Sequence, residues 1–594
     1  MTGADRGAAA AQIAQWLRDG VALHQAGRLD AAAALYARLL AAQPGNVDAL
    51  NLSGVIALQQ GDAAHAVELI GAAVAGNPFF ADALANLGNA YRELSRPAEA
   101  VAAYDRALRL QPKQISALVN RSEARRALGQ CGGAADDLER AFALAPDLPL
   151  SPGQPAADRA RVCDWTRRAE DVAALRGAIA AGREPPGMLE VMALCDDPDL
   201  QQQAAARVAP GAAPVPAVAA GRAGPIRIGY FSGDFRGNAM AFLIAELIEL
   251  HDRDRFEVVG YSWGPVEGDP FHARFRAAFD RFEDVSALND AAVASLARDH
   301  GIDIALDLGG YTRLARPGVF AQCAAPVQVN YLGYPGTLGA DWADYIIADR
   351  VVIPPGSEQG YAEQVVWLPG CYQPNDRRRA IARTAPSRRA EGLPEGAFVF
   401  ACFNQPYKID PELFAGWMGL LRALPGSVLW LIGGLPEAAA NLRAAAQTHG
   451  VAGGRLVFAA PVPLDVHLAR HALADLALDT RACNGHTTTS DALWAGLPVV
   501  TCPGKAFAAR VAASLLDATG LPELVAGSLA EYLALAGTLA RDPGRMAELQ
   551  ARLAAARDTC SLFDTPAYVR GFEAALAEMH RRRCAGLAPA PIKV

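Results

Sequence analysis

Residues 478–504 read LDTRACNGHTTTSDALWAGLPVVTCPG. The apolar run 475–480 that leads into this segment is typical of a buried strand. Polar and glycine residues follow it, and a helix is predicted to begin near Thr488. A second apolar run, 498–504, comes next. Short buried strands alternating with helices indicate parallel sheets that are covered by helices on both faces.

The same alternation runs through the chain from residue 226 onward, in two groups of short apolar runs. The first group is 226–232, 256–262, 303–310, 327–334 and 345–350, and the second is 398–404, 427–434, 455–461, 475–480 and 498–504. Two groups predict two doubly wound α/β domains, over residues 224–385 and 386–594. Ligands of such sheets bind beyond the carboxyl ends of the strands, which here predicts a site in the cleft between the domains.

A 34-residue repeat occupies the N-terminal part of the chain. Prolines recur at this period, as do a series of small residues, a series rich in glycine and a series of bulky residues: Pro44, Pro78, Pro112 and Pro146; Gly20, Gly54, Gly88 and Ser122; Gly27, Gly61, Ser95 and Gly129; Tyr36, Ile70, Tyr104 and Leu138. Small residues let two helices approach closely, and a glycine ends the first helix in a left-handed conformation.

This pattern resembles the tetratricopeptide repeat, with about four helix–turn–helix units over residues 15–150. Stacked repeats form a concave groove that binds peptides or proteins. The alternative is that the repeats only dimerise the chain or cap its catalytic part. Residues 151–223 are predicted to connect the two parts, with helices that include 162–180 and a Pro/Ala-rich linker over 208–225.

The charge and cysteine content of the chain argue against several classes of binding partner and bound group. The net charge is −8 and no long basic run occurs, which argues against nucleic acid. The ten cysteines are scattered singly, without a CxxC pair, so neither structural zinc nor a disulfide framework is expected. No leader-like N-terminus and no run of 18 apolar residues is present, which predicts no membrane helix and a cytoplasmic location.

Polar residues suited to an anion gather where the predicted helix of 478–504 begins. His486, Thr487 and Thr488 lie at its N-terminus, where free backbone N–H groups and the helix dipole favour a diphosphate. Asp491, just inside the helix, could bind a ribose hydroxyl. The alternative is an ordinary helix cap and a first-turn acid with no ligand.

Two further segments offer groups for the same ligand. In ACFNQPYKIDPELFAGW (401–417), Gln405 and Lys408 lie on a loop after a strand, and the lysine could neutralise a departing nucleotide diphosphate. His467 and Arg470 are one turn apart on a predicted helix, and the imidazole could stack on a base. The alternatives are a solvated loop lysine and a surface pair.

Four motifs together resemble the O-GlcNAc transferase family, including its SPINDLY-like bacterial members. They are CFNQPYKIDP, NGHTT followed by DALWAG, GYPGT and PGKAFAARVAAS, and the resemblance runs from the repeats through VCDWT (162–166) to about residue 575. These enzymes link tetratricopeptide repeats to a GT-B pair of Rossmann-like domains and glycosylate serine and threonine of intracellular proteins. The resemblance implies inverting transfer of N-acetylglucosamine from UDP-GlcNAc to Ser/Thr hydroxyls.

The resemblance also implies roles for individual residues. Lys408 would hold the donor phosphates and assist the leaving group, with Gln405 beside it. The remaining donor contacts would be His467 and Arg470 to uracil, Asp491 to ribose, and His486, Thr487 and Thr488 to the diphosphate. No cofactor and no metal are implied, because the lysine and the helix dipole take the place of a cation. The implied partners are a nucleotide sugar and protein acceptors bound in the repeat groove, and a homodimer is possible.

Two positions depart from the family pattern. Asn238 stands where relatives usually carry a histidine, and His300 stands where they often carry an aspartate. Since an asparagine cannot accept a proton as a base, no general base is assigned. Three alternatives stay open: a Spindly-type fucosyltransferase that uses GDP-fucose, a transferase that acts on a small molecule or glycan, and a non-catalytic repeat scaffold.

Overall fold

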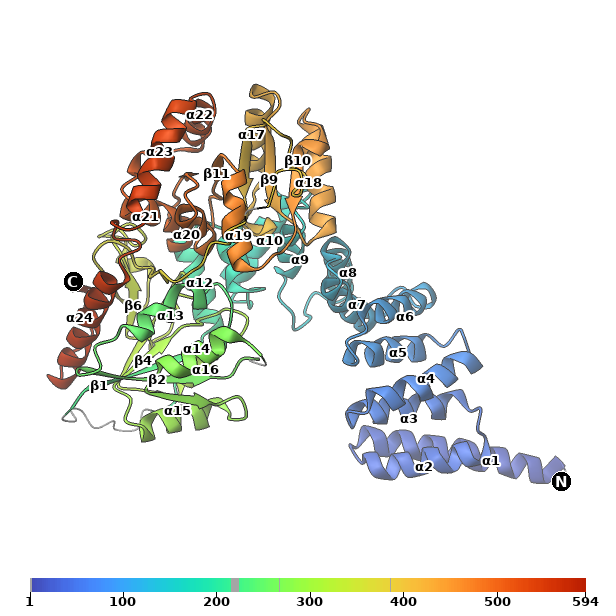
Figure 1. The fold of residues 1–594 in the computed structure, drawn as a ribbon. Coiled ribbons are helices and arrows are strands. Elements are labelled where there is room, and N and C mark those ends of the chain that lie inside the picture. The colour runs from blue at the N-terminus through green and yellow to red at the C-terminus, as the bar shows by residue number, and fades with distance from the viewer. Residues whose placement is uncertain (1–2, 215–223, 266–267, 385) are drawn as a thin grey trace. The chain divides into compact units, whose positions relative to one another are not determined.

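The structure is a computed structural model that describes residues 3–214, 224–265, 268–384 and 386–594. It divides into two compact units, Met1–Leu150 and Ser151–Val594 (Figure 1). Most of the predicted Pro/Ala-rich linker, at 215–223, lies outside the described residues.

The first unit consists of paired antiparallel helices, as the 34-residue period predicts. The pairs are α1 (Gly3–Gln25) with α2 (Leu29–Ala42), α3 (Val47–Gln59) with α4 (Ala63–Gly76), α5 (Ala81–Glu93) with α6 (Pro97–Leu110), and α7 (Ile115–Ala127) with α8 (Cys131–Leu144). Each pair also packs on the next one, as in a tetratricopeptide solenoid. The predicted repeats are confirmed.

The small residues of the repeat lie directly against the bulky ones. A Cβ atom added at Gly20 would lie 2.5 Å from the ring of Tyr36, and one at Gly88 would lie 2.6 Å from the ring of Tyr104. Both rings are fully buried. The glycines therefore permit the two helices of a repeat to close around one aromatic side chain.

The position after the first helix of each repeat has a left-handed backbone. The φ angles are +73° at Gly27, +84° at Gly61 and +72° at Gly129, and Ser95 adopts +56° at the matching place in the third repeat. This conformation costs little for glycine and roughly 1–2 kcal/mol for a residue with a Cβ atom. The serine keeps the repeat geometry at the expense of local strain.

The second unit contains two parallel sheets. The larger has the order β13-β7-β6-β5-β4-β1-β2-β3 and the smaller β10-β9-β8-β11-β12, and all pairings are parallel. The strands of the first are β1 (Ile226–Ser232), β2 (Phe256–Ser262), β3 (Arg281–Asp284), β4 (Ile304–Asp307), β5 (Val327–Asn330), β6 (Tyr345–Ala348), β7 (Gln364–Trp367) and β13 (Ile592–Lys593). Those of the second are β8 (Val399–Cys402), β9 (Val428–Ile432), β10 (Leu456–Ala459), β11 (Leu476–Leu478) and β12 (Val499–Val500).

Helices connect the strands and cover the sheets (Figure 1). The first sheet has α13 (Ala241–Glu249), α14 (Pro270–Ala278), α15 (Asp290–Asp299) and α16 (Pro317–Ala321); the second has α17 (Pro411–Ala423), α18 (Pro436–Thr448), α19 (Leu464–Arg470), α20 (Thr487–Trp494) and α21 (Val511–Ala518). All ten predicted strands occur within the expected runs. The strands β3, β7 and β13 were not predicted, because each is short and two lie at the edges of the sheet.

The end of the chain returns to the first sheet. After α22 (Leu529–Leu539) and α23 (Pro543–Ala556), the helix α24 (Thr565–Cys584) packs against α13 and β5, and β13 pairs with β7. The carboxylate of Glu573 in α24 lies 2.9 Å from Nδ1 of His251, and both side chains are buried. Helix α24 and strand β13 therefore lie with the first sheet, although they follow the second sheet in the chain.

The connector between the repeats and the sheets is a packed part of the second unit. It comprises α9 (Gln154–Arg161), α10 (Arg168–Ala180), α11 (Met188–Leu194) and α12 (Pro198–Val208). The helix predicted at 162–180 begins only at Arg168, since Cys163 has a left-handed backbone, with φ +53°. The Asp196 carboxylate accepts hydrogen bonds from the backbone N–H groups of Lys505 and Ala506, at 2.8 Å each. These bonds tie the connector to the second domain.

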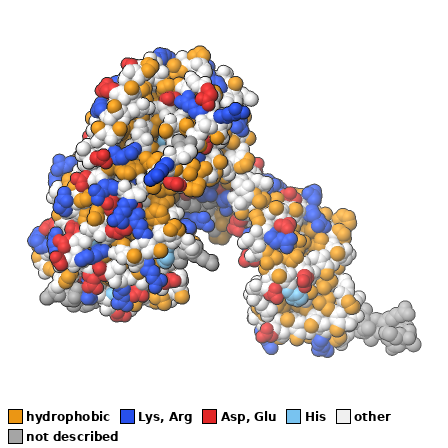
Figure 2. All heavy atoms as spheres, viewed as in Figure 1, with side chains coloured by type: hydrophobic (Ala, Val, Ile, Leu, Met, Phe, Trp, Pro, Cys, Tyr) orange, Lys and Arg blue, Asp and Glu red, His pale blue; other side chains and the backbone are white. Residues whose placement is uncertain are grey.

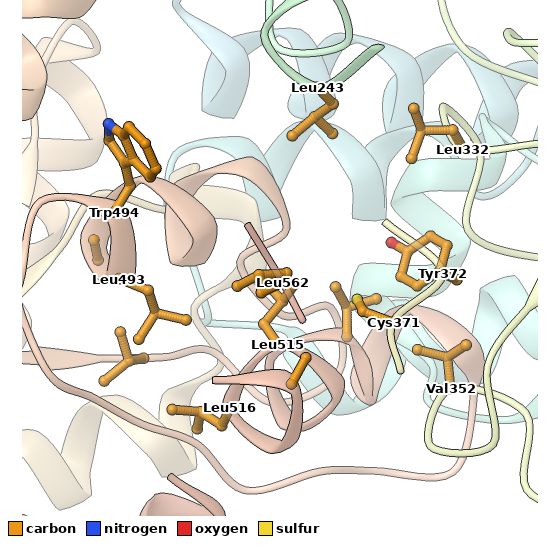
Figure 3. Close-up of a cluster of buried hydrophobic side chains, with 14 of the residues drawn as sticks. Leu243, Leu332, Val352, Cys371, Tyr372, Leu493, Trp494, Leu515, Leu516 and Leu562 are labelled. Carbon is orange, nitrogen blue, oxygen red and sulfur yellow. The ribbon is translucent and has the colours of Figure 1, made fainter. Parts of the chain in front are cut away.

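An apolar seam joins the two sheets into one core (Figure 3). Side chains of α13 and of loops of the first domain share one buried cluster with side chains of α20, α21 and the loop before α24: Leu243, Leu332, Val352, Cys371 and Tyr372 on one side, and Leu493, Trp494, Leu515, Leu516 and Leu562 on the other. All of them are buried. The seam fixes the second sheet against the carboxyl ends of the first.

Charges of both signs are interspersed over the face of the molecule shown in Figure 2. Among the helices in the described part of the chain, none combines the length with the apolar character needed to cross a bilayer.

Candidate active site

A cavity of about 270 Å³ lies between the two sheets, at the predicted position. The first domain supplies the loop between β1 and α13 together with residues that follow β4, β5 and β7. The second domain supplies the start of α20. The lining residues are Asp234, Arg236, Asn238, Ala239, Met240, Leu243, Leu308, Thr312, Leu332, Gly333, Tyr372, Gln373, His486 and Thr487. The polar groups of both domains thus meet where the strands end.

The turn before α20 is organised by Asp479, a buried residue that follows β11. Its carboxylate accepts hydrogen bonds from the Gly485 backbone N–H at 2.6 Å, the Thr501 hydroxyl at 2.7 Å and the Asn404 amide at 3.1 Å. Burial raises the pKa of Asp479 to about 6, although these hydrogen bonds lower it. A Cβ atom at Gly485 would lie 2.6 Å from the Thr488 hydroxyl, so the close turn depends on glycine.

The predicted diphosphate residues lie at the N-terminus of α20. His486 is the N-cap residue, and Thr487 and Thr488 begin the helix. The Thr488 hydroxyl lies 2.5 Å from the Asn404 side-chain oxygen, which links α20 to the loop after β8. Burial and the charge of Lys408 lower the pKa of His486 to about 3, so its imidazole is neutral near pH 7. A neutral ring there leaves the backbone N–H groups and Lys408 as the positive end of the site.

Lys408 ends a short 3-10 helix, η2 (Pro406–Lys408), between β8 and α17. Its Nζ donates a hydrogen bond to the Asn484 backbone carbonyl at 2.7 Å, one residue before Gly485. Burial alone would lower the pKa of Lys408, but Cys483, Tyr407 and Asp479 raise it above its usual value. The ammonium group is therefore charged and lies at the base of the α20 turn. The predicted loop lysine is a partly buried member of the site.

Gln405 precedes η2 and is exposed, three residues from Lys408 in sequence. Its backbone carbonyl accepts the Lys408 N–H at 3.0 Å, which shapes the loop that carries the lysine. The structure thus places Gln405 on the same loop as Lys408, as the sequence indicates.

His467 and Arg470 lie on α19, against Phe403 of the loop after β8. The Arg470 guanidinium stacks over the Phe403 ring at 4.9 Å and donates a hydrogen bond to the Ala460 carbonyl at 2.7 Å. The His467 ring packs edge-on against Phe403, with centroids 5.2 Å apart, and burial lowers its pKa to about 2. Arg470 is only 1% exposed. The surface-pair interpretation is therefore wrong for this arginine, which supports one wall beside β8.

Asp491 lies one turn into α20 and faces a cation from the first α/β domain. This cation is Arg379, near the end of that domain; its ion pair with the Asp491 carboxylate spans 2.5 Å, and both side chains are buried. Burial raises the pKa of Asp491 to about 6, while the charge of Arg379 lowers it. Arg379 also donates a hydrogen bond to the Asn375 side-chain oxygen at 3.0 Å. This pair holds α20 in position, and the proposed contact of Asp491 with ribose stays a prediction.

The two positions that depart from the family pattern have structural roles. The Asn238 amide donates to the Asp234 carboxylate at 2.7 Å, and its oxygen accepts the backbone N–H groups of Met240 and Ala241 at 3.0 and 3.1 Å. Asn238 therefore lines the cavity while it caps the start of α13. His300 follows α15, where its Nδ1 lies 2.8 Å from the Tyr261 hydroxyl, and it is not among the residues that line the cavity.

Several cavity residues were not found from sequence, among them Asp234, Thr312 and Gln373. Gln373 belongs to the stretch CYQPND (371–376), which follows β7, a strand that the apolar pattern did not reveal. These cavity residues could have been predicted from the polar residues that directly follow the strands of the first sheet, because ligands bind beyond the carboxyl ends of parallel strands.

Comparison with known proteins agrees with this architecture. The model of Glycosyl transferase family 41 matches residues 215–385 and 380–572, and tetratricopeptide repeat models match 5–47, 17–72 and 81–114. A mutant of Thermobaculum terrenum O-GlcNAc transferase is a structural neighbour, with a TM-score of 0.58 and 30% identity over 97% of this chain and 99% of that one.

Two curated relatives carry matching descriptions. A probable UDP-N-acetylglucosamine–peptide N-acetylglucosaminyltransferase, SEC of Arabidopsis thaliana, is 38% identical over 62% of this chain and 38% of its own length. The UDP-N-acetylglucosamine–peptide N-acetylglucosaminyltransferase of Caenorhabditis elegans is 29% identical over 61% of this chain and 41% of its own length. The chain thus spans about two fifths of the length of these relatives.

The family model covers every strand of the two sheets except β13, the loop that carries Lys408 and the start of α20, so the match includes the elements that form the cavity. On the strength of this coverage, the chain belongs to glycosyl transferase family 41.

Proposed function

We propose that this protein is an inverting, metal-independent transferase that moves N-acetylglucosamine from UDP-GlcNAc to serine and threonine hydroxyls of proteins. The observation that carries the proposal is the hydrogen bond of the Lys408 ammonium to the turn that begins α20, since His486 and Thr487 at that turn line the interdomain cavity. The descriptions of the matched relatives support the same donor and acceptor.

The positive end of the site suits a nucleotide diphosphate. The first N–H groups of α20 have no partner within the helix, and the Thr487 and Thr488 hydroxyls are next to them. In the proposed reaction, an acceptor hydroxyl oxygen attacks C1 of the sugar while the bond between C1 and the phosphate oxygen breaks. The electron pair of that bond leaves with UDP, and Lys408 and the helix dipole stabilise the new charge. These fixed positive groups supply what a cation would otherwise supply.

The nucleoside end of the donor is assigned to the second domain. We expect uracil near His467 and Arg470, and ribose near Asp491, with Gln405 at the exposed edge of the Lys408 loop. The neutral state of His467 suits stacking on a base, since burial lowers its pKa to about 2. The packing of Phe403 against both His467 and Arg470 supports their joint role.

The proton of the acceptor hydroxyl must leave in the same reaction. The Asn238 amide cannot accept it, and its oxygen is already occupied by two backbone N–H groups. Transfer of the proton to water accounts for the reaction without a side-chain base at this position.

We expect the acceptor protein to bind to the repeats, because their helix pairs form a tetratricopeptide solenoid. The cysteines are all free thiols in the structure, which supports action in a reducing compartment such as the cytoplasm.

The test is transfer of labelled sugar to a library of Ser/Thr-containing peptides, with UDP-GlcNAc, UDP-glucose and GDP-fucose as separate donors. We expect UDP-GlcNAc to be preferred and a chelator to leave the rate unchanged. In Lys408→Met, kcat should fall by roughly 10²–10³, the usual effect of removing a group that stabilises transition-state charge. Lys593→Met is the matched control, because Lys593 is an exposed residue on the edge strand β13.

Full turnover in Lys408→Met would contradict the assigned role of the lysine. A preference for GDP-fucose would replace the proposed donor, and the absence of transfer from every donor would favour a non-catalytic scaffold.

A further inference from the structure

Gln373 is a buried amide that the fold leaves without partners. Its side chain is 1% exposed, and neither Oε1 nor Nε2 has a hydrogen-bond partner among the described residues. A buried primary amide ordinarily bonds to backbone or side-chain groups, because leaving it unpaired destabilises the folded state. A buried amide that is unpaired within the protein and lines a cavity is available to hydrogen-bond a ligand there.

Another buried glutamine of the same domain shows the ordinary arrangement. The Gln328 amide donates hydrogen bonds to the Phe320 and Trp342 carbonyls at 3.0 and 2.7 Å, and its oxygen accepts the Ala324 N–H at 2.9 Å. Gln328 is 4% exposed and does not line the cavity. The two glutamines are therefore buried to a similar extent, but the Gln328 amide is fully hydrogen-bonded whereas the Gln373 amide is unpaired among the described residues.

The backbone around Gln373 is held on both sides, so the side chain keeps its place. The Tyr372 N–H donates to the buried Asp349 carboxylate at 2.8 Å, and the Asn375 amide donates to the Leu562 carbonyl at 3.1 Å. The Tyr372 ring also packs edge-on against Phe507, with centroids 4.9 Å apart. Tyr372 is part of the apolar seam (Figure 3).

Gln373 lines the interdomain cavity together with Thr312, Gly333 and the start of α20. An uncharged amide is a weak partner for a diphosphate, and positive groups for that anion are offered by Arg236 in the cavity lining, by the α20 N-terminus and by Lys408 at the turn before it. An amide offers one acceptor and a donor NH₂ group, which together match hydroxyl groups that donate and accept in turn. The hydroxyl groups of a sugar ring therefore fit the Gln373 amide better than a phosphate group does.

We propose that Gln373 hydrogen-bonds hydroxyl groups of the transferred sugar and thereby determines which nucleotide sugar the site accepts. The proposal rests on the proposed function, since it places the sugar of the donor in this cavity. The Gln373 amide then discriminates between donors, because a nucleotide sugar without the matching hydroxyl groups leaves the amide unpaired and binds more weakly.

The test is a comparison of Kd for UDP and for UDP-GlcNAc by calorimetry, with the full chain and Gln373→Met. Methionine keeps the length of the side chain and removes its polar atoms. We expect Kd for UDP-GlcNAc to rise about tenfold, the scale of one or two lost hydrogen bonds, and Kd for UDP to stay within twofold. The free variant should also have a higher Tm than the wild type, because an unpaired buried amide has been removed.

Gln328→Met is the matched control. It removes satisfied hydrogen bonds, so its Tm should fall while the ratio of the two Kd values stays that of the wild type.

The outcomes separate the two proposals. If the wild type binds UDP-GlcNAc and Gln373→Met leaves that affinity unchanged, or weakens UDP equally, the inference about Gln373 is overturned and the proposed function stands. If the wild type binds no UDP-sugar, the proposed function fails and the inference fails with it.

Discussion

The repeat unit is held together by contacts between residues close in sequence, whereas the candidate site of the two-sheet unit depends on contacts between residues far apart in sequence. In the repeats, Tyr104 fills the space left by Gly88, only 16 residues earlier, and the same arrangement recurs every 34 residues. In the second unit, Lys408 bonds to a carbonyl 76 residues away, and Arg379 pairs with a carboxylate 112 residues away. The repeats are held by near neighbours, whereas the candidate site exists only when both sheets are in place.

This difference predicts different consequences of mutation. A change in the repeats should act on one helix pair and its neighbours, because stability in a solenoid is a sum of local terms. A change at the junction of the two sheets should affect folding and ligand binding together. Three sets of variants test the contrast.

The largest effect is expected at the buried ion pair between Arg379 and Asp491. Arg379→Met leaves the Asp491 carboxylate buried without its cation, which should destabilise the second unit by about 3–5 kcal/mol and weaken UDP binding. Urea unfolding and calorimetry measure the two effects. Arg581→Met is the control, because the Arg581–Glu578 pair lies at the surface and solvent screens it, so that its loss should leave the urea midpoint and the UDP affinity nearly unchanged.

The double variant Arg379→Met/Asp491→Met sharpens this test. It removes both charges, so most of the lost stability should return. UDP affinity should stay low if Asp491 also contacts the ribose. Recovery of affinity together with stability would show that Asp491 only positions α20.

An intermediate effect is expected at the helix contact of the third repeat. In Gly88→Ala, the new methyl group meets the buried Tyr104 ring at 2.6 Å, and overpacking of this kind costs about 1–3 kcal/mol. Hydrogen exchange should speed up in α5 and α6 while the second unit is unchanged. Gly71→Ala is the matched control, because no atom lies within 4 Å of its added methyl group, and alanine should stabilise α4 by about 0.5–1 kcal/mol.

The smallest effect is expected at the turn of the third repeat. Ser95→Gly relieves the left-handed strain at φ +56° and should stabilise the repeats by about 0.5–1 kcal/mol, measured by urea unfolding. The reciprocal change Gly61→Ser, at φ +84° and with no neighbouring atom within 4 Å, should destabilise them by a similar amount. Equal stability of both variants and the wild type would show that the turn does not limit the stability of the repeat.

The fold was largely predictable because its patterns are local. The 34-residue period marks each helix pair, and ten of the strands in the two sheets follow from apolar runs. The strand β13, with two residues, carries no such pattern, and its pairing with β7 depends on the path of α24.

The candidate site was predictable only in part. The residues around Lys408 and His486 follow strands and begin helices, so their positions relative to the sheet could be predicted from sequence. Arg379 and Gln373 follow β7, which was missed, and their partners lie in other elements or are lacking. Nothing in the local pattern distinguishes Gln373 from the fully bonded Gln328.

The sequence by itself determined the repeats, the parallel strands and the polar turn before α20, because period, apolar runs and glycine positions act over a few residues or one repeat. The tertiary structure alone decided that Asp491 pairs with Arg379, that Asn238 bonds to the backbone at the start of α13, and that the Gln373 amide meets no partner in the part of the chain that the structure describes. The physical reason is that hydrogen-bond partners and burial arise from contacts between segments distant in sequence, which form only when the two sheets close on their common seam.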